Sequence, residues 1–428
     1  MDHLKVKETT HQVNGLTLHT IQTTKFKTVT YYFQFRSPIK RETVTQRALL
    51  SGMLKSATQK SPTIKQLNQR LDDLYGATFS SHVQKKGNDH ILSIYVHGVN
   101  DRYLSNNESV ASQSLALLAE AILQPLIEGN AFNKELLNQE KRSLKSRIEA
   151  LYDDKMRFAS QRLIDEMCEG EPFSIHTNGY IEDLEQITPE SLFEAYQTML
   201  KEDEMDLYIV GDVTLKEMLA SVQNHFTFDR EAPLYRSFQP ERQAAGEPKV
   251  VKESQDVEQG KLNIGYRTNI VFGDPDYYAS QVFNGLFGGF PHSKLFMNVR
   301  EKASLAYYAT SRTESFKGLL IVMSGIEFKN YEQATAIIAE QLEKMRQGDF
   351  TELEMKQTKA LLINAVLEGL DNPFSMIDLL YNRVLVKEAQ SLETYADEIE
   401  KVTKEEIIQV ANKVQQDTIY FLHGKEAE

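Results

Sequence analysis

The sequence contains a single cysteine, Cys168, and no apolar run long enough to cross a membrane. One cysteine excludes an intrachain disulfide, and such sparing use is typical of a reducing compartment. A membrane-spanning helix needs about 20 consecutive apolar residues, so we expect no membrane span. The first seven residues also contain no apolar core of a signal peptide. These absences together predict a cytoplasmic protein.

The sequence also has fewer basic than acidic residues. Lys and Arg number 48 against 61 Asp and Glu, which gives a net charge of −13. Nucleic-acid-binding proteins usually present a basic stripe, so we expect no nucleic-acid partner. An acidic surface could favour basic peptides, but most acidic proteins are simply soluble, and we give that interpretation the larger weight. The chain has 428 residues, of which 41% are hydrophobic, enough for two or more domains with packed cores.

The first half of the chain has clear patterns of strands and helices. β-Branched, aromatic and alternating apolar residues predict the strands, and apolar residues at helical spacing predict the helices. Strands are predicted at 16–21, 29–35, 78–84, 90–97 and 206–212. Helices are predicted at 46–54, at 62–76, and from about 133 past 151.

The second half repeats this plan after a polar linker, residues 228–247. Helices that begin near Asn133 and Thr351 are 218 residues apart, and each runs to an acidic pair or Asp-Asn pair at the same offset. We interpret this as an internal duplication. The predicted fold class is α+β, with two homologous domains at 1–227 and 248–428. Each would be a mainly antiparallel sheet with helices packed on one face.

The most specific segment of the sequence lies between Asn284 and Tyr307. It reads Gly-Gly-x-x-x-Ser-x-Leu at 288–295 and Arg-Glu-Lys-x-x-Leu-Ala-Tyr at 300–307. This segment resembles the second domain of the insulinase/pitrilysin-type zinc peptidases, and further agreement is spread over nearly the whole chain. The resemblance implies a clam-like half-chamber that encloses peptides.

The glycine-rich run has a competing interpretation as a phosphate loop. It lacks the Gly-Lys-Ser/Thr ending of a P-loop and the Gly-x-Gly-x-x-Gly spacing of a dinucleotide site. A turn that caps the C-terminus of a helix is the better explanation.

The zinc-binding residues of that family are missing here. Active members bind zinc through H-x-x-E-H on one helix and a Glu on a later helix, and none of the ten histidines begins such a motif. The resemblance places Ala48 and Gly52 at the two His positions and Ser51 at the Glu position. It places Arg147 at the later ligand, seven residues after Glu140. These residues offer no useful ligand and one would repel a dication, so we expect no metal in this chain.

No other catalytic set stands out. His82, His90 and His97 fall on the predicted hairpin, where His90 would lie opposite Gln84, and we interpret them as solvent-facing strand residues. Acidic neighbours would raise the pKa of the Cys168 thiol, so a buried or inert thiol is the better interpretation. The sequence also has no Gly-x-Ser-x-Gly elbow.

Arg300 and Tyr307 are retained, and the resemblance implies that they bind the substrate. A tyrosine hydroxyl and an arginine fork are hydrogen-bond donors that can hold a scissile carbonyl and stabilise the charge that develops on it. Without the resemblance, both would be read as ordinary surface and packing residues.

The leading hypothesis is the non-metal-binding subunit of a heterodimeric zinc metallopeptidase. The family resembled includes two-chain enzymes, in which a homologous H-x-x-E-H subunit carries the zinc and the other subunit carries the Arg/Tyr pair. The alternative is a catalytically inactive homologue that binds peptides or scaffolds a complex. A zinc site built from unrecognised ligands in this chain is a third possibility, and metal analysis would decide it.

Overall fold

The computed structural model describes residues 4–105, 109–228, 230, 238–386 and 391–424. Contacts between residues divide the chain into two compact units. The first unit comprises Val6–Ala150 and Ile175–Arg236, and the second comprises Met1–Lys5, Leu151–Ser174 and Ser237–Glu428. The chain therefore passes from one unit to the other four times.

The first unit is built on a six-stranded sheet with the order β1-β2-β8-β3-β5-β4. Neighbouring strands are antiparallel except for β2 and β8, which are parallel. Its strands are β1 (Glu8–Val13), β2 (Leu16–Gln22), β3 (Thr28–Pro38), β4 (Thr78–Lys86), β5 (Asp89–Val99) and β8 (Glu204–Gly211).

Helices cover one face of this sheet. Alternate residues of β3, such as Phe33 and Phe35, share a core with Leu50 and Leu118 on two of the helices, because successive side chains of a strand point to opposite faces. The helices are α1 (Val44–Ser56), α2 (Ile64–Asp73), α3 (Val110–Leu123), α4 (Lys134–Asp153), α6 (Pro189–Glu202) and α7 (Leu215–His225). A small hairpin of β6 (Ile127–Glu128) and β7 (Ala131–Phe132) precedes α4.

The second unit contains a five-stranded sheet with the order β11-β12-β10-β13-β9. Its strands are β9 (Lys249–Ser254), β10 (Gly260–Arg267), β11 (Ala306–Glu314), β12 (Leu319–Ile326) and β13 (Gln415–His423). Its later helices are α8 (Tyr277–Asn284), α9 (Tyr331–Arg346), α10 (Glu352–Gly369), α11 (Pro373–Leu385), α12 (Leu392–Lys401) and α13 (Lys404–Lys413). Two π-helical turns, η5 (Gly285–Gly289) and η6 (Phe296–Lys302), lie between α8 and β11.

The two sheets confirm the predicted duplication. The order β2-β8-β3-β5-β4 in the first matches β9-β13-β10-β12-β11 in the second, and the single parallel pair, β2 with β8 or β9 with β13, falls at the same place. The starts of α4 and α10, Lys134 and Glu352, are 218 residues apart. The starts of α5 (Lys155–Met167) and α11, Lys155 and Pro373, have the same separation. The α+β class with mainly antiparallel sheets is therefore correct.

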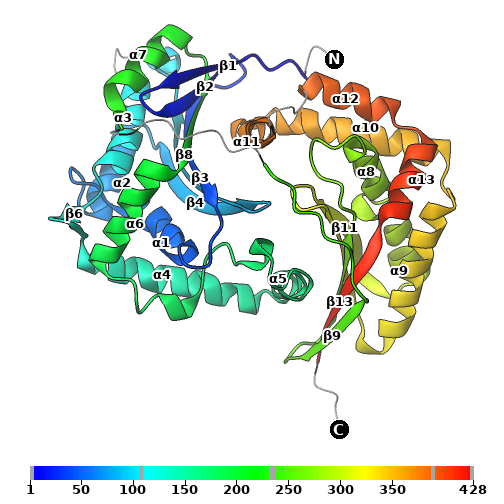
Figure 1. Ribbon diagram of the computed structural model, residues 1–428. Helices are drawn as coiled ribbons and strands as arrows, with labels where there is room; N and C mark the ends of the chain where they lie inside the picture. The colour runs from blue at the N-terminus through cyan, green and yellow to red at the C-terminus, as the bar shows by residue number, and fades with distance from the viewer. Residues whose placement is uncertain (1–3, 106–108, 229, 231–237, 387–390, 425–428) are drawn as a thin grey trace. The chain divides into compact units, whose positions relative to one another are not determined.

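Helix α5 adds a layer that the prediction of helices on one face does not include. Leu163 and Met167 of α5 pack with Ile321 of β12 and Tyr420 of β13 in a separate apolar cluster. Figure 1 shows α5 on the side of this sheet away from α8, α9 and α13. By its contacts α5 belongs to the second unit, although it precedes the linker and falls inside the predicted domain 1–227.

Buried ion pairs hold the residues that follow α5 in place. Arg267 of β10 is 5% exposed and donates to carboxylate oxygens of Glu171 and Asp417, both at 2.7 Å. The ammonium of Lys317 lies 2.6 Å from the second oxygen of Glu171. Breaking one member of a buried group of charges leaves the others uncompensated, so this network ties the residues after α5 to the second sheet.

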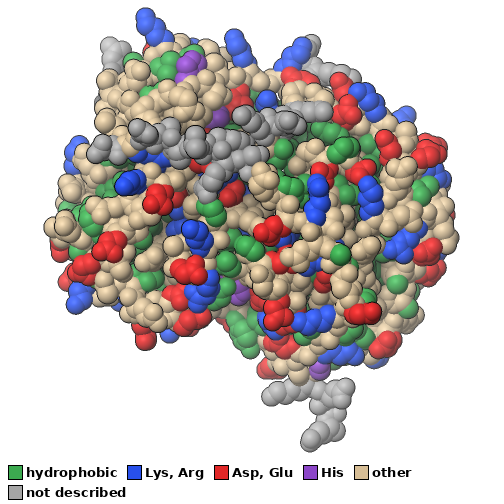
Figure 2. Space-filling model, viewed as in Figure 1, with side chains coloured by type: hydrophobic (Ala, Val, Ile, Leu, Met, Phe, Trp, Pro, Cys, Tyr) green, Lys and Arg blue, Asp and Glu red, His purple; other side chains and the backbone are tan. Residues whose placement is uncertain are grey.

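The described part of the molecule has no helix that is both long and apolar enough to cross a bilayer. On the face shown in Figure 2, lysine and arginine side chains are interspersed with aspartate and glutamate. Mixed charge of this kind gives that face no continuous basic stripe of the sort that nucleic-acid-binding proteins present.

Candidate functional site

The positions matched to the H-x-x-E-H motif lie on α1 and are used for packing. The Ala48 side chain is 1% exposed and belongs to the core of the first unit. The Ser81 hydroxyl on β4 donates to the Ser51 carbonyl oxygen at 2.6 Å and lies 2.5 Å from the Ser51 hydroxyl. Residues 48 and 51 thus fix α1 to its neighbours and leave no polar atom free for a ligand.

Gly52, which the sequence resemblance places at the second histidine position, contacts Glu140 of α4. A β-carbon at residue 52 would overlap the Glu140 carboxylate and lie 3.0 Å from its Cδ. Glu140 is 6% exposed, and its Oε1 accepts a hydrogen bond from the Ser56 hydroxyl at 2.7 Å. The carboxylate therefore occupies the space that any side chain at residue 52 would need.

Arg147 lies on the same face of α4 as Glu140. Seven residues make about two helical turns, and Leu144 between them is buried. Arg147 itself is half-buried. Within the described residues it forms no ion pair and no hydrogen bond. The structure thus brings Glu140 to Gly52 and places Arg147 farther along the face that Glu140 occupies.

These side chains do not fit a metal ion. Under the match that the sequence resemblance implies, the imidazoles and carboxylates of a zinc site are replaced by a methyl group, a paired hydroxyl, a glycine and a guanidinium. Elsewhere in the described residues, no group of three or more His, Cys, Asp or Glu side chains is arranged to hold a metal. The described residues therefore supply no ligand set for a catalytic metal ion.

Arg300 lies in the second unit, on η6. Its guanidinium stacks over the Phe296 ring at 4.6 Å from the ring centre. Its Nε is 3.6 Å from an oxygen of Glu301, and both side chains are more than 40% exposed, so this ion pair is weak. Phe296 supports the guanidinium on one side and leaves its donors accessible. In the sequence, the only sign of this support is that Phe296 lies one helical turn before Arg300.

Tyr307 lies on β11, an edge strand of the second sheet. The pairing with β12 shifts between Ala306 and Tyr308, so Tyr307 is the unpaired residue of a β-bulge. Its side chain is 70% exposed, whereas that of Tyr308 is half-buried. Burial raises the pKa of the Tyr308 hydroxyl to about 12. The bulge therefore turns one tyrosine of the pair outward.

A short connection joins η6 to β11. Ser304 has a positive φ of 53°, and the Leu305 amide donates to the Val299 carbonyl at 3.1 Å. A non-glycine residue in this conformation is uncommon and persists where surrounding contacts hold it. The connection fixes how Tyr307 follows Arg300 within the second unit.

The glycine-rich run is not the helix cap that the sequence predicts. Residues 285–289 continue α8 as a π-helical turn, and none of these glycines has a positive φ. A β-carbon on Gly288 would lie 2.6 Å from the Ser311 amide nitrogen. The Gly288 carbonyl oxygen accepts a hydrogen bond from the Thr310 hydroxyl at 2.9 Å. The glycine allows the turn to pack closely against β11, which is the reason that a cap prediction is wrong.

His90 is also placed differently from the prediction. It lies opposite Lys85 rather than Gln84, and it is fully buried rather than solvent-facing. Its Nδ1 accepts from Arg47 Nε at 3.0 Å, and its Nε2 donates to the Thr177 carbonyl at 2.9 Å. It is therefore a packed core histidine. Burial lowers its pKa to about 3, helped by the nearby Arg47 charge.

Cys168 is buried at the C-terminal end of α5, as predicted. A fully buried side chain is inaccessible to a substrate, so the structure gives this thiol a packing role.

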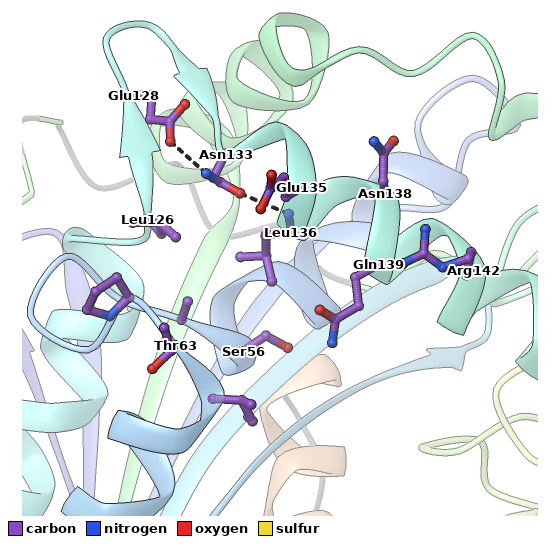
Figure 3. Close-up of a pocket in the computed structure, with 13 residues that line it drawn as sticks. Ser56, Thr63, Leu126, Glu128, Asn133, Glu135, Leu136, Asn138, Gln139 and Arg142 are labelled. Carbon is purple, nitrogen blue, oxygen red and sulfur yellow. Dashed lines mark hydrogen bonds between the residues drawn. The ribbon is translucent and has the colours of Figure 1, made fainter.

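A groove of about 730 Å³ opens beside α4 in the first unit (Figure 3). Ser56, Thr63, Gln139 and Arg142 are among its lining residues. Glu128 and Asn133, joined by a 2.6 Å hydrogen bond, form part of its rim. The groove mixes both signs of charge and contains no nucleophile paired with a base, so it offers no catalytic arrangement.

Comparisons with known proteins agree with these features. Residues 186–362 match the model of the "Peptidase M16 inactive domain" family. A Bacillus subtilis protein called "Probable inactive metalloprotease YmfF" is 47% identical over 98% of this chain and 99% of its own length. A crystal structure of a conserved protein from Enterococcus faecalis V583 shares 37% identity, covers 98% of this chain and 99% of that chain, and superposes with a TM-score of 0.89.

The fold extends to more distant structures. A peptidase M16 inactive domain from Pseudomonas fluorescens covers 98% of this chain and 99% of that chain, with a TM-score of 0.80 at 16% identity. The high identity to the Bacillus subtilis protein over nearly the whole length shows the family. The chain belongs to the insulinase-type M16 peptidase family, as a homologue without the zinc-binding residues.

Proposed function

We propose that this chain is the non-metal-binding subunit of a two-chain metallopeptidase. Arg300 and Tyr307 would bind the peptide, and a homologous H-x-x-E-H subunit would supply the zinc ion and the general base. The observation that carries the proposal is Tyr307, held 70% exposed on a β-bulge. A large aromatic side chain kept in solvent by a special backbone geometry suggests a binding role rather than packing.

The chemistry of the pair suits an amide substrate. The Arg300 guanidinium has several N–H donors and the Tyr307 hydroxyl has one, and both groups can donate to a peptide carbonyl oxygen. Donors that are already in place gain strength as negative charge develops on that oxygen. Neither group is a nucleophile here, so this chain would orient the substrate and complete a site begun by its partner. The cytoplasm predicted from the lone Cys168 would hold both subunits.

Co-expression with an H-x-x-E-H homologue tests the proposal. Arg300→Ala and Tyr307→Phe should each lower kcat/KM of the purified pair for a fluorogenic peptide, by about 100-fold for a lost donor. Matched controls are Arg157→Ala, which removes a 77% exposed arginine of α5, and Tyr103→Phe, which alters a 46% exposed tyrosine of the first unit. Unchanged cleavage in both test variants would rule out the composite site.

An inactive peptide-binding or scaffolding protein is the second candidate. It is favoured by the words "inactive" in the matching family model and in the name of the Bacillus subtilis relative. The two candidates differ in turnover, because a scaffold adds nothing to the cleavage rate of its partner. Metal analysis of the purified chain tests the third possibility, and stoichiometric zinc in it would overturn both proposals.

A further inference from the structure

Arginine side chains in this molecule almost always have a partner. Of the arginines that the structure describes, all but Arg142 and Arg147 form an ion pair, a hydrogen bond, or another ring or electrostatic contact. Arg142 is exposed and lines the groove beside α4, where water solvates it. Arg147 is half-buried, and that difference sets it apart.

Two apolar residues lie close to Arg147 along α4. Leu144, one turn earlier on the same face, is 1% exposed, and the adjacent Ile148 packs against the core of the first unit. Glu140, a buried carboxylate two turns away, is already bonded to Ser56. The aliphatic stem of Arg147 is partly covered, whereas none of its nitrogen atoms is among the buried polar atoms without a partner, so its N–H donors remain accessible. Such a group is poised for an acceptor from outside the chain.

We propose that Arg147 binds a carboxylate group carried by a peptide. The guanidinium presents planar, paired donors that match the two oxygens of a carboxylate. The group would be a C-terminal carboxylate or an Asp or Glu side chain, which present the same chemistry. This assignment rests on the proposed function only in taking the ligand to be a peptide. It involves the first unit alone and requires neither a partner subunit nor Arg300.

The test uses the full chain and dye-labelled decapeptide pools that carry a neutral dye, and the first two of these pools contain no Asp or Glu. One pool has free C-terminal carboxylates, a second has C-terminal amides, and a third is amidated but carries one internal Asp or Glu. Fluorescence anisotropy gives the dissociation constant of each pool for the wild type, for Arg147→Gln and Arg147→Lys, and for the matched control Arg142→Gln.

We expect the wild type to bind at least one carboxylate pool about 10-fold or more tighter than the amide pool, as a charge-assisted bidentate contact would give. The pool preferred, first or third, identifies the source of the carboxylate. Arg147→Gln should remove the preference, Arg147→Lys should retain part of it, and Arg142→Gln should keep it whole.

Three results would overturn the assignment. They are failure of every pool to bind, equal binding of carboxylate and amide pools, and an equal loss in Arg142→Gln and Arg147→Gln, which would indicate general charge attraction. Thermal unfolding checks that Arg147→Gln is folded, and removing a cation without a partner should leave its Tm within a few degrees of the wild type. Loss of the Arg300 effect on cleavage would refute the proposed function and leave this assignment standing.

Discussion

The Glu140 carboxylate lies against Gly52 so closely that a β-carbon at residue 52 would overlap it. The two residues come from different helices, α1 and α4, and each fits only because of the other. Ser56 completes the contact by donating to Glu140. If residue 52 is the second ligand position, as the sequence resemblance implies, then that position is filled by a packed and hydrogen-bonded group as well as lacking a ligand.

Gly52→Ala should destabilise the protein by about 1 kcal/mol. Replacing a glycine inside a helix by alanine normally adds about 1 kcal/mol of stability, but here the Glu140 carboxylate must turn away and lose its bond to Ser56. Urea unfolding measures the change. Gly246→Ala, where a β-carbon meets nothing within 4 Å, is the control and should be close to neutral.

A double-mutant cycle sharpens this prediction. In a Glu140→Ala background the obstacle is gone, so Gly52→Ala should become stabilising. A stabilising effect of Gly52→Ala in the wild-type background would show that the overlap costs nothing.

Deprotonation of His19 should destabilise the folded protein at high pH. Burial lowers its pKa, but hydrogen bonds to Asp206 and Glu8 outweigh this and raise the pKa to about 9. The folded state therefore keeps a proton that the unfolded chain loses near 6.5. This contribution is complete below pH 6.5 and is lost as the pH rises through 9, by up to about 3 kcal/mol.

Urea unfolding of the wild type and His19→Gln at pH 6 and pH 10 measures this effect. The stability difference between the two proteins should shrink markedly at pH 10. If the difference in stability is the same at pH 6 and pH 10, the His19 imidazolium does not stabilise the strands around it.

His90 should act in the opposite direction, at low pH. Burial and the Arg47 charge lower its pKa to about 3, although the hydrogen bond to Thr177 opposes this. Below pH 6.5 the unfolded chain binds a proton at this histidine that the folded chain does not bind. The free energy of unfolding therefore decreases as the pH is lowered, by about 2 kcal/mol at pH 5. His90→Gln, compared with the wild type at pH 7 and pH 5, should lose less stability over this interval. Parallel curves would contradict the buried neutral imidazole.

Leu163→Ala should loosen the second unit, although Leu163 precedes the linker. Truncating a buried leucine costs about 2–5 kcal/mol, and this side chain packs against β12 and β13. Hydrogen exchange should speed up in α5, β12 and β13 together while α1 and β3 stay protected. The matched variant Leu144→Ala on α4 should show the reverse. Faster exchange in α1 with Leu163→Ala would place α5 in the other unit.

Much of the fold could be predicted from local patterns. Residues 29–35 are rich in β-branched and aromatic side chains and lie within β3, and Thr351 opens α10 through a capping box with Glu354. The equal offset of the paired helices correctly indicated the duplication. These features depend on residues near one another in the chain, where periodicity and capping carry the information.

Features that depend on pairing at a distance were less accessible. The hairpin turn has two residues, Gly87 and Asn88, so Lys86 pairs with Asp89; a turn centred on Gly87 itself shifts each pair by one residue. That shift hid the true partner of His90.

The contact of Glu140 with Gly52 has no local signature in the sequence, and the docking of α5 has none within the helix itself. The continuous apolar run of β12, Leu319 to Val322, was the one sign that this strand is covered on both faces. The positions of Arg300 and Tyr307 were identified by resemblance, but the bulge that exposes Tyr307 was not.

The docking of α5 has a consequence for dividing the chain. A gene split at the linker would encode one product with a helix whose apolar side has no place in its own half. The other product would carry a sheet with one bare face, open to aggregation. Separating the two halves at the linker should therefore expose apolar surface in both products.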